Sequence, residues 1–345
     1  MVNITSVNLS TLASSLLYAS SITDITLTAN SSLQFVSYNK TFLEILGPHV
    51  SQRLIGERSY QFVHEAGIYL PSTNKVYISS NYQTLSNPVN ITTIDLSNNY
   101  SITEAQYPDL IFANGGCPYQ GKALFCAEGS FEKPSSLALL DPVTNTTTIL
   151  LDNFLGRDFS SLNDIKLHNK TGDLWFTDAQ YGYFQNFRPK PTIPNQVYRF
   201  TPSTGVVQVV ADGFEQSNGI EFSPDYLTCY ITDTGAMTVT QNPLGAATIY
   251  AFDVVGGKYL RNRRVFAYSD VGFPDGIHTD TEGNVYAGCG DGVHVWNTDG
   301  VLLGKILVDG GSNNFAFVPD GMLVFNGKKL YLATIAARGR DVGGT

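Results

Sequence analysis

The stretch SNGIEFSPDYLTCYITDT (residues 217–234) contains two short runs of β-forming residues joined by a Ser-Pro-Asp turn. The first run opens on Ser217-Asn218-Gly219, and the second ends at Thr232-Asp233. Alternating apolar residues bounded by turn residues predict two strands connected by a tight turn.

The same arrangement recurs elsewhere in the chain. The two clearest copies are SLNDIKLHNKTGDLWFTDA (161–179) and FPDGIHTDTEGNVYAGCG (273–290). Three looser copies are HEAGIYLPSTNKVYISSN (64–81), GGCPYQGKALFCAEGS (115–130) and SNNFAFVPDGMLVFNGKKLYLATI (312–335). The openings fall near Glu65, Gly116, Asn163, Asn218, Asp275 and Asn314. This step of roughly 40 to 57 residues matches a four-stranded propeller blade and is too long for a leucine-rich or ankyrin repeat. The predicted fold is therefore an all-β six-bladed β-propeller.

A length of 345 residues would by itself suggest two domains, but a closed all-β architecture can hold the whole chain in a single domain. We predict a single propeller domain over 1–345, with recognisable blades in 61–335. Residues 1–60 are expected to include a strand that closes the ring by joining the last blade. A composition of 12% aromatic residues, only 15% charged residues and 32 glycines favours many short strands and argues against disorder.

The net charge limits the classes of binding partner that are expected. A net charge of −9 and a pI near 5.0 disfavour nucleic acid, whose phosphates require a basic surface. No run approaches eighteen consecutive apolar residues, so no membrane span is expected. The expected partner is a small molecule.

The compartment is indicated by Asn-x-Ser/Thr sequons. The N-terminus lacks a basic region followed by an apolar core, so it does not read as an intact signal peptide. Eight sequons occur in polar, turn-like segments, at Asn3, Asn8, Asn30, Asn39, Asn90, Asn99, Asn145 and Asn169. They favour a secreted glycoprotein whose leader was removed. The alternative is a cytoplasmic chain, rich in Asn, Ser and Thr, with accidental sequons.

The four cysteines give a second indication of the compartment. Cys117 and Cys126 flank CPYQGKALFC, a spacing at which a hairpin disulfide is expected in an oxidising compartment. Cys229 and Cys289 lie within apolar runs and are expected to be buried thiols. The cysteine and histidine spacings resemble no zinc site.

Polar residues at the starts of the inner strands predict a metal site. In a propeller these starts converge on the channel although they are about fifty residues apart in sequence. They include Glu65, Asn163, Asn218 and Asp275, an all-oxygen set with two carboxylates. Such a set suits Ca²⁺, which takes oxygen ligands in irregular geometry, better than zinc. We therefore expect a central calcium site.

A long proline-rich segment follows the third repeat. It reads YGYFQNFRPKPTIPNQVYRF (181–200), and its prolines exclude a central strand. Long loops in compact domains are often functional. We expect a substrate lid with Tyr181, Tyr183, Phe184 and Phe187. The alternative is a surface loop packed by its own aromatic residues.

Four segments resemble the senescence-marker-protein / gluconolactonase / luciferin-regenerating-enzyme family, with a more distant likeness to diisopropylfluorophosphatase and paraoxonase. The segments are HEAGIYLPSTNKVYIS, SLNDIKLHNKTGDLWFTD, SNGIEFSPDYLTCYITD and PDGIHTDTEGNVYAGCGDGVHVWNTDGVLLGKI. The likeness extends from about residue 60 to 335, and the ordered set is more specific than any single motif. It implies a six-bladed propeller with one catalytic divalent cation, usually calcium, at the channel mouth.

The resemblance also implies residue roles. Glu65 takes the place of the first-blade glutamate ligand, Asn218 that of the Ser-Asn-Gly asparagine, and Asp275 that of the Pro-Asp-Gly aspartate. Asn163 takes the place of an asparagine that binds the metal or contacts substrate. Since the family's aspartate faces the substrate, Asp275 is the expected catalytic base or nucleophile. His64 is expected to point away from Glu65, on the opposite side of its strand.

The function implied is calcium-dependent hydrolysis of a lactone. One departure is Ser161, which stands where sugar-lactone members often carry an arginine, so sugar specificity is not implied. Two alternatives remain open. The same metal site could act on another apolar substrate, by aryl-ester or organophosphate hydrolysis or by a biosynthetic cyclisation or isomerisation, or the propeller could be a non-catalytic binding module. No Gly-x-Ser-x-Gly motif supports a serine hydrolase.

Overall fold

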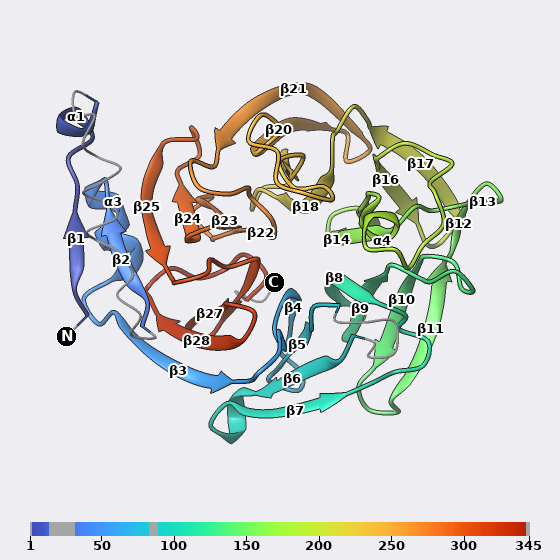
Figure 1. Cartoon of the computed structure of the whole chain (residues 1–345), viewed down its shortest axis with the longest axis horizontal. Coiled ribbons are helices and arrows are strands. Elements are labelled where there is room, and N and C mark those ends of the chain that lie inside the picture. Colours follow the sequence, from blue (N-terminus) through green and yellow to red (C-terminus); the bar gives the residue numbers. More distant parts are fainter. Residues whose placement is uncertain (1, 14–31, 83–88, 343–345) are drawn as a thin grey trace.

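Six sheets surround a central channel in the computed structural model, which describes residues 2–13, 32–82 and 89–342 (Figure 1). The first strand of each sheet lies at the channel, and successive strands lead outward to the rim. Neighbouring first strands contact one another around the ring, as in the pairs β4–β8, β8–β14, β14–β18 and β26–β4. This confirms the predicted six-bladed β-propeller.

Blades 1 to 4 are built from strands that are consecutive in sequence. Blade 1 contains β4 (Glu65–Leu70), β5 (Lys75–Ser79), β6 (Ile91–Asp95) and β7 (Ser101–Ala105). Blade 2 contains β8 (Ala113–Tyr119), β9 (Lys122–Ala127), β10 (Ser136–Asp141) and β11 (Thr146–Leu151). Blade 3 contains β14 (Leu162–His168), β15 (Asp173–Asp178), β16 (Gln196–Thr201) and β17 (Val206–Ala211). Blade 4 contains β18 (Ser217–Phe222), β19 (Thr228–Asp233), β20 (Thr248–Val255) and β21 (Tyr259–Tyr268).

Blades 5 and 6 combine strands from both ends of the chain. Blade 5 contains β22 (Ile277–Thr279), β23 (Val285–Cys289), β24 (Gly292–Trp296) and β25 (Leu302–Leu307), and is extended by β2 (Gln34–Ser37) and β1 (Ile4–Ser6). Blade 6 contains β26 (Asn314–Val318), β27 (Gly321–Phe325), β28 (Lys329–Thr334) and β3 (Ser51–Glu57). The pairing of β3 with β28 runs from Ser51 opposite Thr334 to Glu57 opposite Lys329 and closes the ring.

Helical segments are short. Those in the described ranges are α1 (Leu9–Leu12), α3 (Lys40–Leu46), α4 (Tyr181–Phe184) and the 3₁₀ turn η1 (Leu96–Asn98). A small ribbon, β12 (Asn153–Phe154) with β13 (Arg157–Asp158), joins blades 2 and 3. Within the described ranges, no helix has the length and apolar character needed to cross a membrane.

Burial decreases from the channel to the rim. Every residue of β18 is buried, whereas the outermost strands β11 and β17 contain only exposed and half-buried residues. The hydrophobic core lies between adjacent blades, where Leu124 of blade 2 joins Ile165 and Phe176 of blade 3. Inner strands are therefore buried even where they carry polar residues, as β18 does with Asn218 and Glu221, and outer strands carry the solvated face.

The structure contradicts the predicted Cys117–Cys126 disulfide. In the β8–β9 hairpin Cys117 lies opposite Leu124, and Cys126 pairs with Leu137 of the next strand. Both cysteines are free thiols in the apolar core between blades 2 and 3, and burial raises the pKa of each. Sequence spacing allowed a bridge, but the hairpin register does not place the two residues opposite each other. Cys229 and Cys289 are also buried and free.

The C-terminal segment closes one end of the channel. Gly339 forms a bridge with Asp280, and the Arg340 backbone N–H donates to the Thr279 carbonyl oxygen. The Arg340 guanidinium lies 2.8 Å from Glu221 Oε1 in β18. Access to the channel is therefore left at the opposite end, which we call the mouth.

Candidate functional site

Each blade contributes at least one polar side chain to a cavity of ≈ 320 Å³ at the channel mouth, and one of these from each blade forms a set of six. These six residues, which we call the mouth ring, are Glu65, Asn114, Asn163, Asn218, Asp275 and Asn313. All four residues predicted as metal ligands are among them. The structure thus brings together side chains that are up to 248 positions apart in the chain.

Local irregularities in the inner strands direct these side chains into the cavity. Strand pairing shifts register across Asn114, Asn163 and Asn218, and between Ala66 and Ile68 just after Glu65, as at β-bulges. Glycine follows Asn114, Asn218 and Asp275, where the next blade approaches closely: a Cβ on Gly219 would lie 2.5 Å from the Asp275 carbonyl oxygen. The recurrent Asn-Gly and Asp-Gly pairs of the repeats are therefore required by packing as well as by turns.

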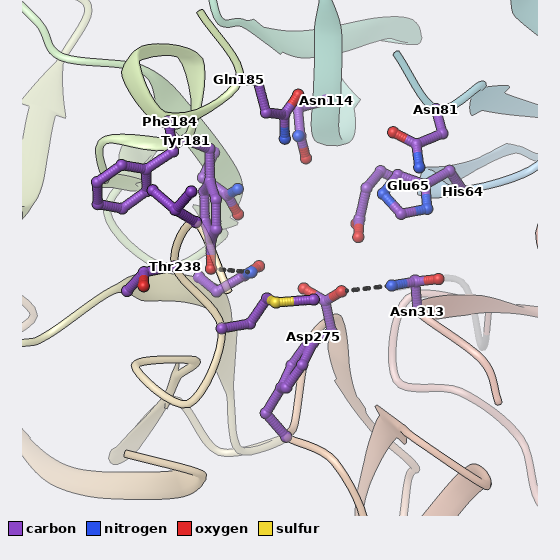
Figure 2. Close-up of a pocket in the computed structure, with 15 residues that line it drawn as sticks. His64, Glu65, Asn81, Asn114, Tyr181, Phe184, Gln185, Thr238, Asp275 and Asn313 are labelled. Atoms are coloured by element: carbon purple, nitrogen blue, oxygen red, sulfur yellow. Dashed lines mark hydrogen bonds between the residues drawn. The ribbon is translucent and has the colours of Figure 1, made fainter. Parts of the chain in front are cut away.

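Two asparagines from blade 6 orient the two carboxylates. Asn313 Nδ2 donates to Asp275 Oδ2 at 2.9 Å, and Asn314 Nδ2 donates to Glu65 Oε2 at 2.7 Å. Figure 2 shows Glu65 and Asp275 directed into the cavity, with Asn313 bonded to Asp275. Both acids are nearly inaccessible, at 4% and 6% exposure.

The mouth ring holds negative charge without a matching cation. The fifteen described residues that line the cavity include no lysine or arginine. Burial, and then the charge of Asp275, hold the pKa of Glu65 well above its usual range. Burial raises the pKa of Asp275 to about 6, although the hydrogen bond from Asn313 opposes the shift. Placing two buried acids side by side is costly unless a cation is bound.

Unpartnered amide oxygens support the same conclusion. The Oδ1 atoms of Asn163 and Asn114 are buried and have no hydrogen-bond partner. Among the described residues no three or more His, Cys, Asp and Glu side chains group as a metal site, so the available donors are two carboxylates and amide oxygens. Such oxygen donors fit a hard cation such as Ca²⁺.

Asn114 was missed from the sequence. We placed the opening of the second repeat at Gly116, whereas the residue that enters the cavity lies two positions earlier. The signal was present as the pair Asn114-Gly115, which matches Asn218-Gly219. A Cβ on Gly115 would lie 2.5 Å from Asp164 Oδ1, the same close approach to the next blade.

The prediction for His64 was wrong. This histidine lines the cavity beside Glu65 instead of facing away from it (Figure 2). It precedes β4, and Ala66 and Gly67 have positive φ, so simple strand alternation does not apply. Burial lowers the pKa of His64 to about 4, and a hydrogen bond with Asn313 partly opposes this. The imidazole is therefore neutral near pH 7.

Ser161 does not reach the cavity. Its hydroxyl donates to Glu128 Oε2 at 2.8 Å and accepts from the Gly182 N–H at 3.0 Å. Glu128 also accepts from Asn114, and burial raises the pKa of Glu128 to about 7. Ser161 thus supports α4 and the Asn114 side chain indirectly.

The expected lid residues divide into two groups. Tyr181 and Phe184 of α4 line the cavity, and the Tyr181 hydroxyl contacts Thr234 and Asn218. Tyr183 is 41% exposed and does not line the cavity. Phe187 is buried and stacks on Phe112 at 4.2 Å between ring centroids, so it anchors the segment.

Three apolar residues complete the cavity wall and were not predicted. Met237 and Val239 follow β19, and Phe273 precedes Asp275. Nothing in their local sequence distinguishes them from ordinary loop residues.

Fold and site together define a six-bladed propeller with an oxygen-rich ring at one end of its channel. The family profile described as "SMP-30/Gluconolactonase/LRE-like region" matches residues 57–336. The chain therefore belongs to this family.

Individual relatives have names that match this family, and a solved structure has the same fold. Lactonohydrolase oryL of Aspergillus oryzae is 34% identical over 74% of this chain and 63% of its own length. A gluconolactonase of Zymomonas mobilis is 30% identical over 54% of this chain and 53% of its own length. The chain thus spans less than two thirds of either relative. A gluconolactonase structure from Xanthomonas campestris superimposes with a TM-score of 0.72 at 22% identity, covering 87% of this chain and 94% of that one.

Proposed function

We propose that this protein hydrolyses a lactone with the help of one divalent cation, calcium, held by Glu65, Asn163, Asn218 and Asp275. The observation that carries the proposal is the mouth ring, in which two buried acids and unpartnered amide oxygens meet without a protein cation. Relatives named lactonohydrolase and gluconolactonase support the reaction. A superimposable regucalcin from Agrobacterium tumefaciens, described as calcium-binding, supports the metal (TM-score 0.63, 19% identity, covering 84% of this chain and 95% of that one).

The cation would supply Lewis-acid stabilisation of the negative charge that develops on the carbonyl oxygen. Asp275 is the proposed base or nucleophile, because it is directed into the cavity and Asn313 fixes its orientation. As a base it takes a proton from water while the water oxygen bonds to the carbonyl carbon. The ring C–O bond then breaks, the leaving oxygen is protonated, and a hydroxy acid results.

Tyr181 would position the substrate. Its hydroxyl is held by Asn218 and Thr234, and burial, followed by the charge of Asp275, raises the pKa of this phenol. It therefore remains a neutral hydrogen-bonding group at the cavity wall. Asn81, Asn114 and Gln185 provide further amide groups on the wall.

Metal removal tests the proposal. We expect chelation to abolish hydrolysis of γ-butyrolactone and glucono-δ-lactone, measured by pH-stat titration, and to lower the melting temperature. Adding calcium should restore both, since a ligand that binds only the folded state adds RT ln(1 + [L]/Kd) to stability. Unchanged activity and melting after chelation would overturn the metal assignment. Failure to open any lactone in saturating calcium would overturn the reaction.

We also propose that the chain is secreted and glycosylated. Of the sequons, Asn3, Asn8, Asn39, Asn99, Asn145 and Asn169 are exposed, Asn90 is half-buried, and Asn30 lies outside the described residues. The exposed positions could carry glycan without displacing core residues. Expression in a secreting fungal host should yield protein whose mass falls on treatment with an N-glycosidase. An unchanged mass would argue for the cytoplasmic alternative.

A further inference from the structure

The wall of the mouth cavity is divided chemically between two halves of the propeller. Apolar side chains come from the region of blades 3 to 5: Phe184 after β15, Met237 and Val239 after β19, and Phe273 before β22. Polar side chains come from blades 6, 1 and 2: Asn313, His64, Asn81 and Asn114. Figure 2 shows Phe184 and Tyr181 on the side opposite Asn81 and His64.

Apart from the mouth-ring residues Asn163, Asn218 and Asp275 and the Tyr181 hydroxyl, the polar side chains of the apolar half lie at the rim. Gln185 and Thr238 are exposed, whereas Phe184, Met237 and Phe273 are half-buried. The apolar half therefore extends down toward Asp275 and does not merely surround the opening. Val239, 71% exposed, continues this half outward. A ligand bound at the mouth ring would cover surface that is now partly exposed to water.

The apolar half of the cavity offers few partners to a highly polar ligand. Among the described lining residues no side chain is cationic, so a second anionic group on the substrate would find no counter-charge. Ser161 is engaged with Glu128 and Gly182 outside the cavity. A polyhydroxylated ring would bury hydroxyls against Phe184 and Phe273, where they lose hydrogen bonds to water without gaining partners.

We infer that the preferred substrate is a neutral lactone bearing an apolar substituent, such as an alkyl chain, and not a polyhydroxylated sugar lactone. This rests on the proposed lactone hydrolysis. The substituent packs against Phe184, Met237, Val239 and Phe273, and the lactone carbonyl lies at the mouth ring. At about 30 Å³ for each water-sized group, the cavity holds on the order of ten non-hydrogen atoms. A small lactone ring with a chain of several carbons fits this volume.

The test is a substrate series. We would measure kcat/KM in saturating calcium for γ-lactones with unbranched alkyl chains of zero to six carbons, together with glucono-δ-lactone and an alkyl-substituted δ-lactone. Burial of each methylene should raise kcat/KM roughly fourfold until the cavity is filled. The alkyl δ-lactone should exceed glucono-δ-lactone. Equal values along the series, or a preference for glucono-δ-lactone, would overturn the inference.

Two matched variants test whether the apolar half of the cavity causes the dependence on chain length. Phe184→Ala should lower the ratio of kcat/KM between the longest and the unsubstituted lactone at least tenfold. Tyr183→Ala, one position earlier on the same helix but outside the cavity, should leave this ratio unchanged. If the ratio is unchanged in Phe184→Ala, the alkyl chain does not bind to the apolar half of the cavity.

A binding measurement separates this inference from the proposed reaction. The non-hydrolysable alkyl γ-lactams can be titrated by calorimetry whether or not any lactone is opened. Affinity that rises with chain length, with a heat-capacity change that becomes more negative, supports the apolar site even if hydrolysis fails. Affinity independent of chain length overturns the inference even if hydrolysis succeeds.

Discussion

Glu65 and Glu221 are both buried glutamates of inner strands, at 4% and 1% exposure, yet their surroundings differ. Glu65 at the channel mouth receives an amide hydrogen bond from Asn314 and lies near another acid, Asp275. Glu221 at the closed end lies 2.8 Å from Arg340 and 3.4 Å from Lys166. Burial by itself raises the pKa of both, but Arg340 and then Lys166 lower the pKa of Glu221 to about 2.

The difference separates a structural ion pair from a binding site. At the closed end the chain supplies its own cations, so the charges are balanced within the fold. At the mouth the chain supplies amides, the Tyr181 hydroxyl and a neutral His64 but no lysine or arginine, so the proposed external cation would balance the two carboxylates. Asn314 links the two regions, since it donates to Glu65 and its Oδ1 lies 3.1 Å from His278 Nε2, while His278 contacts Lys166.

Removing the carboxylate of Asp275 at the mouth should produce the largest effect on activity. Asp275→Asn keeps a carbonyl oxygen for calcium but cannot accept a proton or attack carbon. Turnover should fall by a factor on the order of 10² to 10⁴, while calcium affinity falls less. Lactone hydrolysis titrated with calcium provides the measurement. If excess calcium restores near-parental turnover, Asp275 is only a ligand.

Glu65→Gln is the matched comparison at the mouth. Since Glu65 is proposed as a ligand only, this variant should lose activity through loss of metal. Excess calcium should then recover part of the activity, unlike in Asp275→Asn. If excess calcium fails to recover activity in both variants, the proposed division of roles between Glu65 and Asp275 is wrong.

Neutralising the acid at the closed end should affect stability instead of chemistry. Glu221→Gln removes the buried carboxylate that Lys166 and Arg340 share, and breaking a buried ion pair typically costs about 3–5 kcal/mol in the free energy of unfolding. Urea denaturation measures the loss, and the exposed Glu282→Gln serves as the control. Calcium affinity should remain close to that of the parent. A stability change as small as that of the control would show that the ion pairs contribute little.

The two ends should also respond oppositely to pH. The raised pKa of Asp275, about 6, stabilises the metal-free protein below its ordinary pKa of 3.8, and this contribution is lost as pH rises through 6. At roughly 1.4 kcal/mol per pKa unit it amounts to about 3 kcal/mol. The lowered pKa of Glu221 acts in the other direction: its contribution is present above pH 4.5 and is lost as pH falls toward 2. His64, with its pKa lowered to about 4, opposes the trend at the mouth between pH 6.5 and 4.

Melting temperatures between pH 4 and 8, with chelator and with calcium, measure this dependence. The pKa of Glu65, held well above its usual range, adds to the effect of Asp275, and the two acids together should outweigh His64. The chelated protein should therefore melt higher near pH 5 than near pH 7.5, and calcium should reduce or reverse that difference. Asp275→Asn should show a smaller difference than the parent in chelator. A chelated protein that is most stable above pH 7 would contradict the proposed repulsion at the mouth.

Much of the candidate site could be predicted because the repeats are local patterns. Asn163, Asn218 and Asp275 open repeats with the same turn chemistry, and a closed ring of such repeats must bring their first residues together. Asn114 and His64 escaped for a related reason: bulges at the inner strands shift which residue enters the channel, and the two-residue alternation of a strand does not anticipate a bulge. The disulfide prediction failed because spacing does not specify hairpin register.

The sequence alone determined the six blades and most of the oxygen donors at the mouth, because strand periodicity, turn residues and the repeat step are properties of short segments. Only the tertiary structure decided how charge is balanced at each end of the channel and which apolar residues line the cavity. Arg340 reaches Glu221 from 119 positions away, and Phe184, Met237 and Phe273 meet only through the assembly of three blades. Burial and pairing depend on neighbours distant in the chain, so no local pattern reports them.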